Sequence, residues 1–69
     1  MQLVINKVRG YRKMMNLSQK DLAEMLGISI QSYSNREKGV TAFRDEEKKI
    51  MKELFKEIDE TLTIDDIFF

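Results

Sequence analysis

The chain contains no cysteine, no histidine and no proline. Without cysteine it has neither a disulfide framework nor a thiolate metal site. Without histidine it lacks the commonest general base and metal ligand, and it shows no glycine-rich phosphate loop either. No apolar run reaches the ~18 to 20 residues that cross a bilayer, and no signal-peptide pattern opens the chain. These absences predict a soluble cytoplasmic protein that is not an enzyme and holds no metal or cofactor.

The residues that are abundant favour helices. Leucine, lysine, glutamate and methionine are all frequent in the 69 residues, and each is a good helix former. A chain of this length is near the lower limit at which a hydrophobic core holds a fold without disulfides or metals. We therefore expect one small all-α domain over residues 1–69.

The formal net charge is zero, but the two signs are unevenly distributed. Residues 1–44 carry eight Lys or Arg against three acids, a net charge of +5. Residues 45–69 carry four Lys against nine acids, a net charge of −5. A divided field of this kind can orient a protein on a phosphate backbone. The alternative is an ordinary mixed surface.

The clearest motif lies in residues 17–39, LSQKDLAEMLGISIQSYSNREKG. A serine that can cap a helix precedes each of two helical segments, Ser18 and Ser29, and a glycine follows each, Gly27 and Gly39. The predicted helices cover residues 19–26 and 30–38. Their connection is too short for antiparallel packing, so we expect a steep crossing, as in a helix-turn-helix unit. Such a unit presents one polar helix face that can enter a DNA groove.

This stretch resembles the helix-turn-helix of the Cro and phage-repressor (XRE-type) family of regulators. The matching residues are Leu17, Ser18, Gln19, Leu22, Ala23, Leu26, Gly27, Ile28, Ser29, Glu37 and Gly39. The resemblance implies a compact five-helix, lambda-repressor-like fold and sequence-specific binding to double-stranded DNA by a transcriptional regulator. It does not identify the operator.

The resemblance also implies which residues meet the bases. It places Tyr33 in the interior, so the opposite face of the helix over residues 30–38 carries the candidates for base contact: Ile30, Gln31, Ser32 and Asn35. The amide of Gln31 can pair with adenine N6 and N7, Asn35 can do the same or reach guanine, and Ile30 suits a thymine methyl. For any one of these residues the alternative is plain solvated surface.

A second set of residues is expected to contact the DNA backbone: Gln19, Ser29, Arg36, Lys38, Thr41 and Arg44. Gln19 lies at the positive end of a helix dipole, where an anion is favoured. Arg36 departs from the family pattern, which commonly has an apolar residue there. A guanidinium is not buried without a partner, so its stem is expected to pack while its head reaches a phosphate or an acid, unless the helix is rotated.

The family pairs an arginine in its first helix with a glutamate near the end of the recognition helix. In this chain the two positions are occupied by Arg12 and Glu37. The resemblance therefore implies an ion pair that joins these helices. The alternative is two independent surface charges, which would contribute less than about 1 kcal/mol.

Three further helices are expected around the motif. Ile5, Val8, Tyr11 and Met15 trace one face of a first helix that Asn16 ends, with Met1 to Val4 as an extended lead-in. Gly10, in this helix, allows close packing or is a tolerated surface residue. Phe43 is expected in the core.

Asp45 is expected to cap a fourth helix that runs to about Ile58. Thr63 and Asp66 form a capping-box pattern that opens a short fifth helix. The tail carries more apolar residues than so small a domain is expected to bury: Leu62, Ile64, Ile67, Phe68 and Phe69. This surplus indicates either a homodimer surface or closure of the core by the tail.

The leading hypothesis is a repressor of phage or mobile-element type that binds a palindromic operator as a homodimer. It would work at the nucleoid, and no small-molecule substrate or membrane partner is evident. The second hypothesis is a protein-interaction module of the same fold, an antirepressor or an antitoxin-like partner, favoured by the neutral net charge and the apolar tail.

Overall fold

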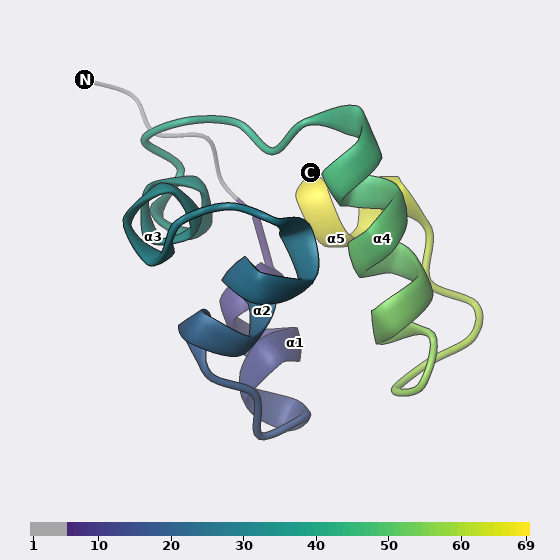
Figure 1. Ribbon diagram of the computed structural model, residues 1–69. Helices are drawn as coiled ribbons and strands as arrows, with labels where there is room; N and C mark the ends of the chain where they lie inside the picture. The colour runs from purple at the N-terminus through teal and green to yellow at the C-terminus, as the bar shows by residue number, and fades with distance from the viewer. Residues whose placement is uncertain (1–5) are drawn as a thin grey trace.

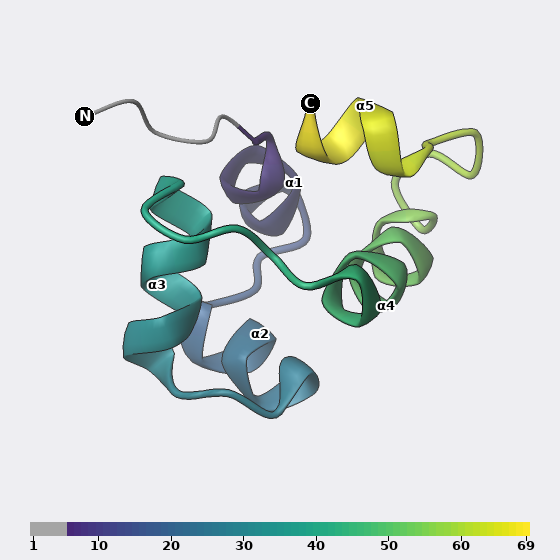
Figure 2. The ribbon, with the colours of Figure 1, turned by 90° about the horizontal axis from the view of Figure 1, so that it is seen from above.

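Five helices form the part of the chain that the computed structural model describes, residues 6–69, and no strand lies among them (Figure 1). They are α1 (Val8–Met14), α2 (Gln19–Leu26), α3 (Ile30–Lys38), α4 (Asp45–Phe55) and α5 (Ile64–Phe68). In Figure 2, α1 lies between α3 on one side and α4 and α5 on the other. The expected all-α fold is confirmed, while the expected lead-in and Ile5 lie outside the described residues.

Local capping interactions set the bounds of α2 and α3, which are those expected. The Oγ of Ser18 accepts the N–H of Asp21 at 3.0 Å, and the Asp21 carboxylate accepts the N–H of Ser18 at 2.8 Å. Ser29 caps α3 in the same way by accepting the N–H of Ser32 at 3.0 Å. Gly27 (φ 69°) and Gly39 (φ 84°) end the two helices in the left-handed conformation that glycine adopts without strain.

The fourth helix differs from the expectation at both ends. Arg44 is its N-cap, since the Glu47 carboxylate accepts the N–H of Arg44 at 2.9 Å, and Asp45 is already helical. The helix ends at Phe55 instead of Ile58. Residues 56–58 continue as a turn in which Ile58 is exposed and does not extend the buried face.

All five helices and the loop before α4 contribute to one hydrophobic core. Its buried members are Val8, Leu22, Ala23, Tyr33, Phe43, Met51, Phe55, Leu62, Ile67 and Phe68. The ring of Phe43 packs edge-on between those of Tyr33 and Phe68, with centroids 6.0 Å and 5.4 Å away. Tyr33 and Phe43 thus face inward as expected, and Tyr33 is the only fully buried residue of α3.

The C-terminal tail closes the core of its own chain. Leu62, Ile67 and Phe68 are buried, and the N–H of Lys7 donates to the carbonyl of Ile67 at 2.8 Å. Only Phe69 stays largely outside, with 73% of its surface exposed. Of the two uses expected for the apolar tail, core closure therefore accounts for nearly all of it.

Gly10 is a surface residue, and a Cβ built on it meets no atom within 4 Å. Close packing is therefore not its purpose.

We expect Gly10→Ala to raise the free energy of unfolding by about 0.5–1 kcal/mol, because alanine loses less backbone entropy in a helix. Gly27→Ala adds the same methyl group into equally open space, but at φ 69°. In this control variant the free energy of unfolding should fall by about 1 kcal/mol. Urea denaturation measures both changes. If both substitutions changed the free energy of unfolding in the same direction, the roles assigned to Gly10 and Gly27 would be wrong.

Candidate nucleic-acid interface

The outward side of α3 carries amide and hydroxyl groups. Burial of Tyr33 fixes the rotation of the helix about its axis, which leaves Ile30 and Gln31 exposed and Ser32 and Asn35 half-buried. The amide of Gln31 donates to Asn35 Oδ1 at 3.4 Å, a long contact between residues one helical turn apart. Both amides therefore keep further donors and acceptors for another molecule.

The two serines at the start of α3 are engaged with each other. Besides accepting the N–H of Ser32, the hydroxyl of Ser29 donates to the hydroxyl of Ser32 at 3.0 Å. Ser29 itself is exposed at the helix N-terminus, where unpaired N–H groups favour an anion. Its position fits the expected phosphate contact, while the hydroxyl of Ser32 already has a partner in the helix.

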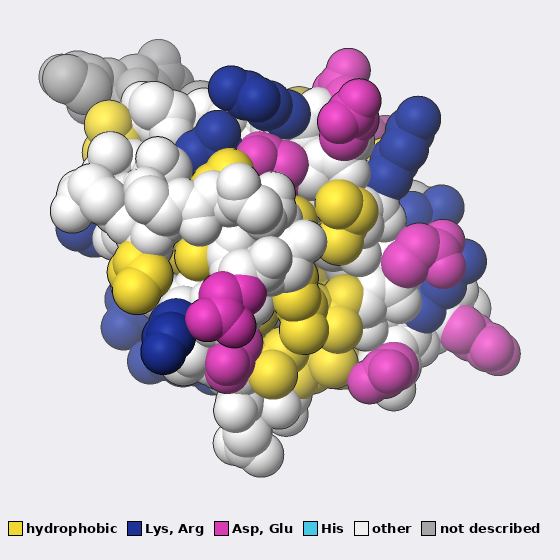
Figure 3. All heavy atoms as spheres, in the orientation of Figure 1, with side chains coloured by type: hydrophobic (Ala, Val, Ile, Leu, Met, Phe, Trp, Pro, Cys, Tyr) yellow, Lys and Arg dark blue, Asp and Glu magenta, His cyan; other side chains and the backbone are white. Residues whose placement is uncertain are grey.

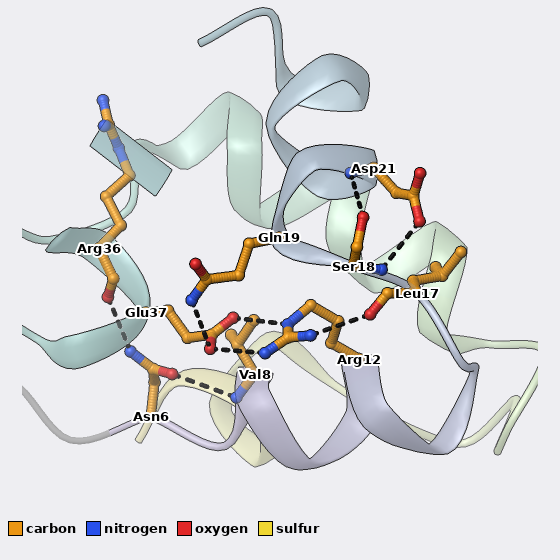
Figure 4. Close-up of polar contacts among 9 residues, drawn as sticks. All are labelled: Asn6, Val8, Arg12, Leu17, Ser18, Gln19, Asp21, Arg36 and Glu37. Atoms are coloured by element: carbon orange, nitrogen blue, oxygen red, sulfur yellow. Dashed lines mark hydrogen bonds and ion pairs between the residues drawn. The ribbon is translucent and has the colours of Figure 1, made fainter. Parts of the chain in front are cut away.

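A polar hollow of about 380 Å³ opens between α1, α2 and α3. The side chains that line it are Arg9, Arg12, Gln19, Ser34, Glu37 and Lys38. Arg12 Nε donates to Glu37 Oε2 at 2.9 Å, and its terminal nitrogens donate to Glu37 Oε1 at 3.0 Å and to the Leu17 carbonyl at 2.9 Å (Figure 4). The pair implied by the resemblance is therefore present as a two-pronged contact that joins α1 to α3.

The charged state of this pair follows from its surroundings. Burial raises the pKa of Glu37, but the hydrogen bond from Arg12 and the neighbouring polar groups of Tyr33 and Gln19 outweigh it, so the pKa lies below the ordinary value of 4.5. The hydrogen bond to Glu37 raises the pKa of Arg12, and burial raises that of the Tyr33 hydroxyl beside them. The Tyr33 hydroxyl therefore stays neutral at pH 7. At neutral pH Arg12 and Glu37 are therefore both charged, and the two buried charges neutralise each other.

Gln19 belongs to the same cluster. Its amide donates to Glu37 Oε1 at 3.3 Å across the gap between α2 and α3, as Figure 4 shows. An amide nitrogen has two hydrogens, so one remains for a phosphate at the N-terminus of α2. The expected phosphate contact is compatible with this geometry, although sequence reasoning did not foresee the bond to Glu37.

Arg36 points away from this cluster and toward α4. Its Nε lies 2.9 Å from Glu47 Oε1 without hydrogen-bond alignment, and the two side chains are only 11% and 7% exposed. The contact is therefore an ion pair held by charge and burial. Of the two partners expected for the head of Arg36, a phosphate or an acid, the structure shows an acid, and the phosphate contact stays a prediction. Glu47, its partner, was not among the residues singled out from the sequence.

Three other candidates for the DNA backbone lie exposed around the end of α3 and the loop that follows it: Lys38, Thr41 and Arg44. The N–H groups of Val40 and Thr41 both donate to the carbonyl of Asn35, at 2.9 and 3.3 Å, so the start of the loop is folded back on α3. The loop is therefore held by the same helix that carries the candidate base contacts.

Two contributors to this region were missed by the sequence analysis. Arg9 lines the hollow because it lies one helical turn before Arg12, a spacing that could have revealed it. Asn6 accepts the N–H of Val8 and donates to the carbonyl of Arg36 at 3.2 Å, which ties the start of α1 to the end of α3. No local pattern indicates that second contact.

The surface charge agrees only in part with the division into a basic and an acidic half that the sequence suggested. In Figure 3 most acidic side chains lie over α4 and the segment after it, where lysines are interleaved with them, and a few lie over α2. The edge formed by α3 shows none in this view. On the face seen in Figure 3, the acidic C-terminal third therefore does not cover α3.

Two further properties concern residues 6–69 as a whole. No helix in this range combines the length and apolar character that crossing a bilayer requires. No three His, Cys, Asp or Glu side chains of the range gather in a way that could hold a metal ion.

Helices α2 and α3 cross steeply (Figures 1 and 2), have capped ends, and present polar side chains of α3 beside exposed cations. These features define a helix-turn-helix protein of the DNA-binding class. A family model described as helix-turn-helix matches residues 8–61, from α1 to the turn before α5. The chain therefore belongs to the Cro/C1-type, XRE-like family of DNA-binding transcription regulators. No curated protein and no solved structure shows significant similarity to it.

The lowered pKa of Glu37 makes stability depend on pH. Because the folded-state pKa lies below the unfolded one, this contribution is fully present above about pH 4.5 and is lost as the pH falls through the folded value. Urea denaturation at decreasing pH should show this loss. The double variant Arg12→Met/Glu37→Leu replaces the pair with apolar chains and should flatten the dependence. An NMR titration that places Glu37 at or above 4.5 would contradict the assignment.

Proposed function

We propose that this chain acts as a repressor of phage or mobile-element type, a single DNA-binding domain that inserts α3 into the major groove of a palindromic operator. The observation that carries the proposal is the outward face of α3. Gln31 and Asn35 project from it on the side opposite the buried Tyr33, with exposed Lys38 and Arg44 nearby. Amides in this arrangement can read adenine edges, while cations hold the backbone.

The hollow between α1, α2 and α3 supports the placement of the DNA backbone. Its cations Arg9 and Lys38 and the amide of Gln19 surround a space that a phosphate fits, beside the N-terminus of α2. The buried pair Arg12–Glu37 contributes no net charge there. The attraction for a phosphate therefore depends on the exposed cations and the helix dipole.

The length of α3 supports binding as a homodimer. Its nine residues extend about 14 Å, which matches only about four base pairs. A site this short recurs throughout a genome, so specificity requires a second copy of the helix. A two-fold homodimer would place the two helices about 34 Å apart on one face of the duplex.

Selection from a random DNA pool tests the base contacts. The wild-type chain should select a palindrome whose half-sites are about one helical turn apart, and its complex should have the mass of two chains per duplex. Gln31→Ala should relax the preference at one position per half-site, by about 1–3 kcal/mol of discrimination. Lys38→Met, by comparison, should weaken all sequences alike. Unchanged DNA binding by Gln31→Ala/Asn35→Ala would contradict the proposal and favour a protein-interaction module.

The salt dependence of binding tests the backbone contacts. Lys38→Met and Arg44→Met should each reduce the slope of log K against log salt concentration by about one unit, because each removes one phosphate contact. Lys56→Met makes the same change of charge beyond α4, where Lys56 pairs with Glu53. This control should leave the slope unchanged. A slope that is the same in all three variants would exclude Lys38 and Arg44 as phosphate contacts.

A further inference from the structure

The ion pair between Arg36 and Glu47 connects the recognition helix to α4 at an unusual cost. Both side chains are nine-tenths buried or close to it, and removing two charges from water is expensive. A pair of apolar residues would join the helices at least as well in terms of stability alone. The function of this pair is therefore inferred from its position in the fold and not from its contribution to stability.

Glu47 contacts the chain on both sides of the loop that follows α3. Its Oε1 contacts Arg36 near the end of α3 and accepts the N–H of Arg44 at the start of α4, both at 2.9 Å. The loop over residues 39–44 lies between the end of α3 and this second contact, and it includes the candidate phosphate contacts Thr41 and Arg44. One carboxylate oxygen thus fixes both ends of the segment.

The same end of α3 is held from the other side. The side chain of Asn6 donates to the carbonyl of Arg36 at 3.2 Å, and the neighbouring Glu37 is bound by Arg12 (Figure 4). Residues 36 and 37 are therefore the points at which α3 is attached by directional polar contacts. Of the candidate base-reading residues, Ile30, Gln31 and Ser32 lie in the N-terminal part of the helix, and Asn35 directly precedes Arg36.

We propose that Arg36 and Glu47 are positioning residues for DNA binding, whose ion pair fixes the loop over residues 39–44 relative to the base-reading face of α3. The loop and the helix then meet the backbone and the bases as one rigid surface. This inference rests on the proposed function. It assigns to Arg36 a role through Glu47 and the loop, with no phosphate contact of its own.

The decisive variant is Glu47→Gln, tested on the duplex that the wild-type chain selects from the random pool. Glutamine keeps an oxygen that can accept the N–H of Arg44, so α4 retains its cap, but the charge that holds Arg36 is gone. Loss of a positioning contact of this kind should weaken binding by about two- to thirtyfold. Glu53→Gln, on the exposed side of the same helix, makes the same change of charge and is the control. It should bind as the wild type does or slightly more tightly.

The sign of the effect separates this role from the alternative. If Arg36 were a phosphate contact restrained by Glu47, Glu47→Gln would release it and tighten binding, which would overturn the proposal. If the pair positions the loop, Arg36→Met weakens binding to a similar degree as Glu47→Gln. The double variant is then no weaker than either single one, because both remove the same interaction. Additive losses would overturn the proposal.

A purely structural role is excluded by measuring affinity where every variant is fully folded, as judged by circular dichroism and a thermal melt. Lower melting temperatures with unchanged affinity at that temperature would overturn the proposal. If the wild-type chain selects no duplex, the proposed function fails and this inference with it; if it does and Glu47→Gln binds as tightly, only this inference fails.

Discussion

The placement of α3 depends on the contact between Arg12 and Glu37. This helix gives the core only one fully buried side chain, Tyr33, so apolar packing alone does not define its orientation. A single aromatic ring permits the helix to tilt about it, whereas the two-pronged hydrogen bonds from a guanidinium to a carboxylate fix direction as well as distance. The buried charges are tolerated because each is matched and because Gln19 and the Leu17 carbonyl satisfy their remaining groups.

Buried pairing also changes what the charge distribution means. The basic half of the chain counts eight cations, but Arg12 and Arg36 are both neutralised by glutamates inside the protein. One of these glutamates, Glu47, comes from the acidic half, so the division at residue 44 overstates the contrast between the two halves. The charge that a phosphate backbone would meet comes from exposed side chains such as Arg9, Lys38 and Arg44. A count along the sequence cannot separate the two groups, because pairing is decided by the tertiary structure.

Features with a local physical cause were predictable from the sequence. The bounds of α2 and α3 follow from a serine before and a glycine after each helix, and the structure has the same bounds. The predicted end of α4 at Ile58 was wrong, because Ile58 fits the apolar periodicity yet lies in a turn after Phe55. Apolar periodicity alone does not distinguish a last helical turn from a turn that follows the helix. The pairing of Arg36 with Glu47 joins side chains eleven residues apart on different helices. The sequence showed that Arg36 needed a partner but offered several acids for the role.

The residues proposed to read DNA contribute little to holding the fold together. Ile30 and Gln31 are exposed, and Asn35 is only half-buried, while α3 is anchored through Tyr33, Arg36 and Glu37. The positions proposed for recognition are thus different from those that anchor this nine-residue helix. Substitutions of the outward amides of Gln31 and Asn35 can therefore accumulate during evolution while the fold stays stable, and under the proposed function each would change the DNA target.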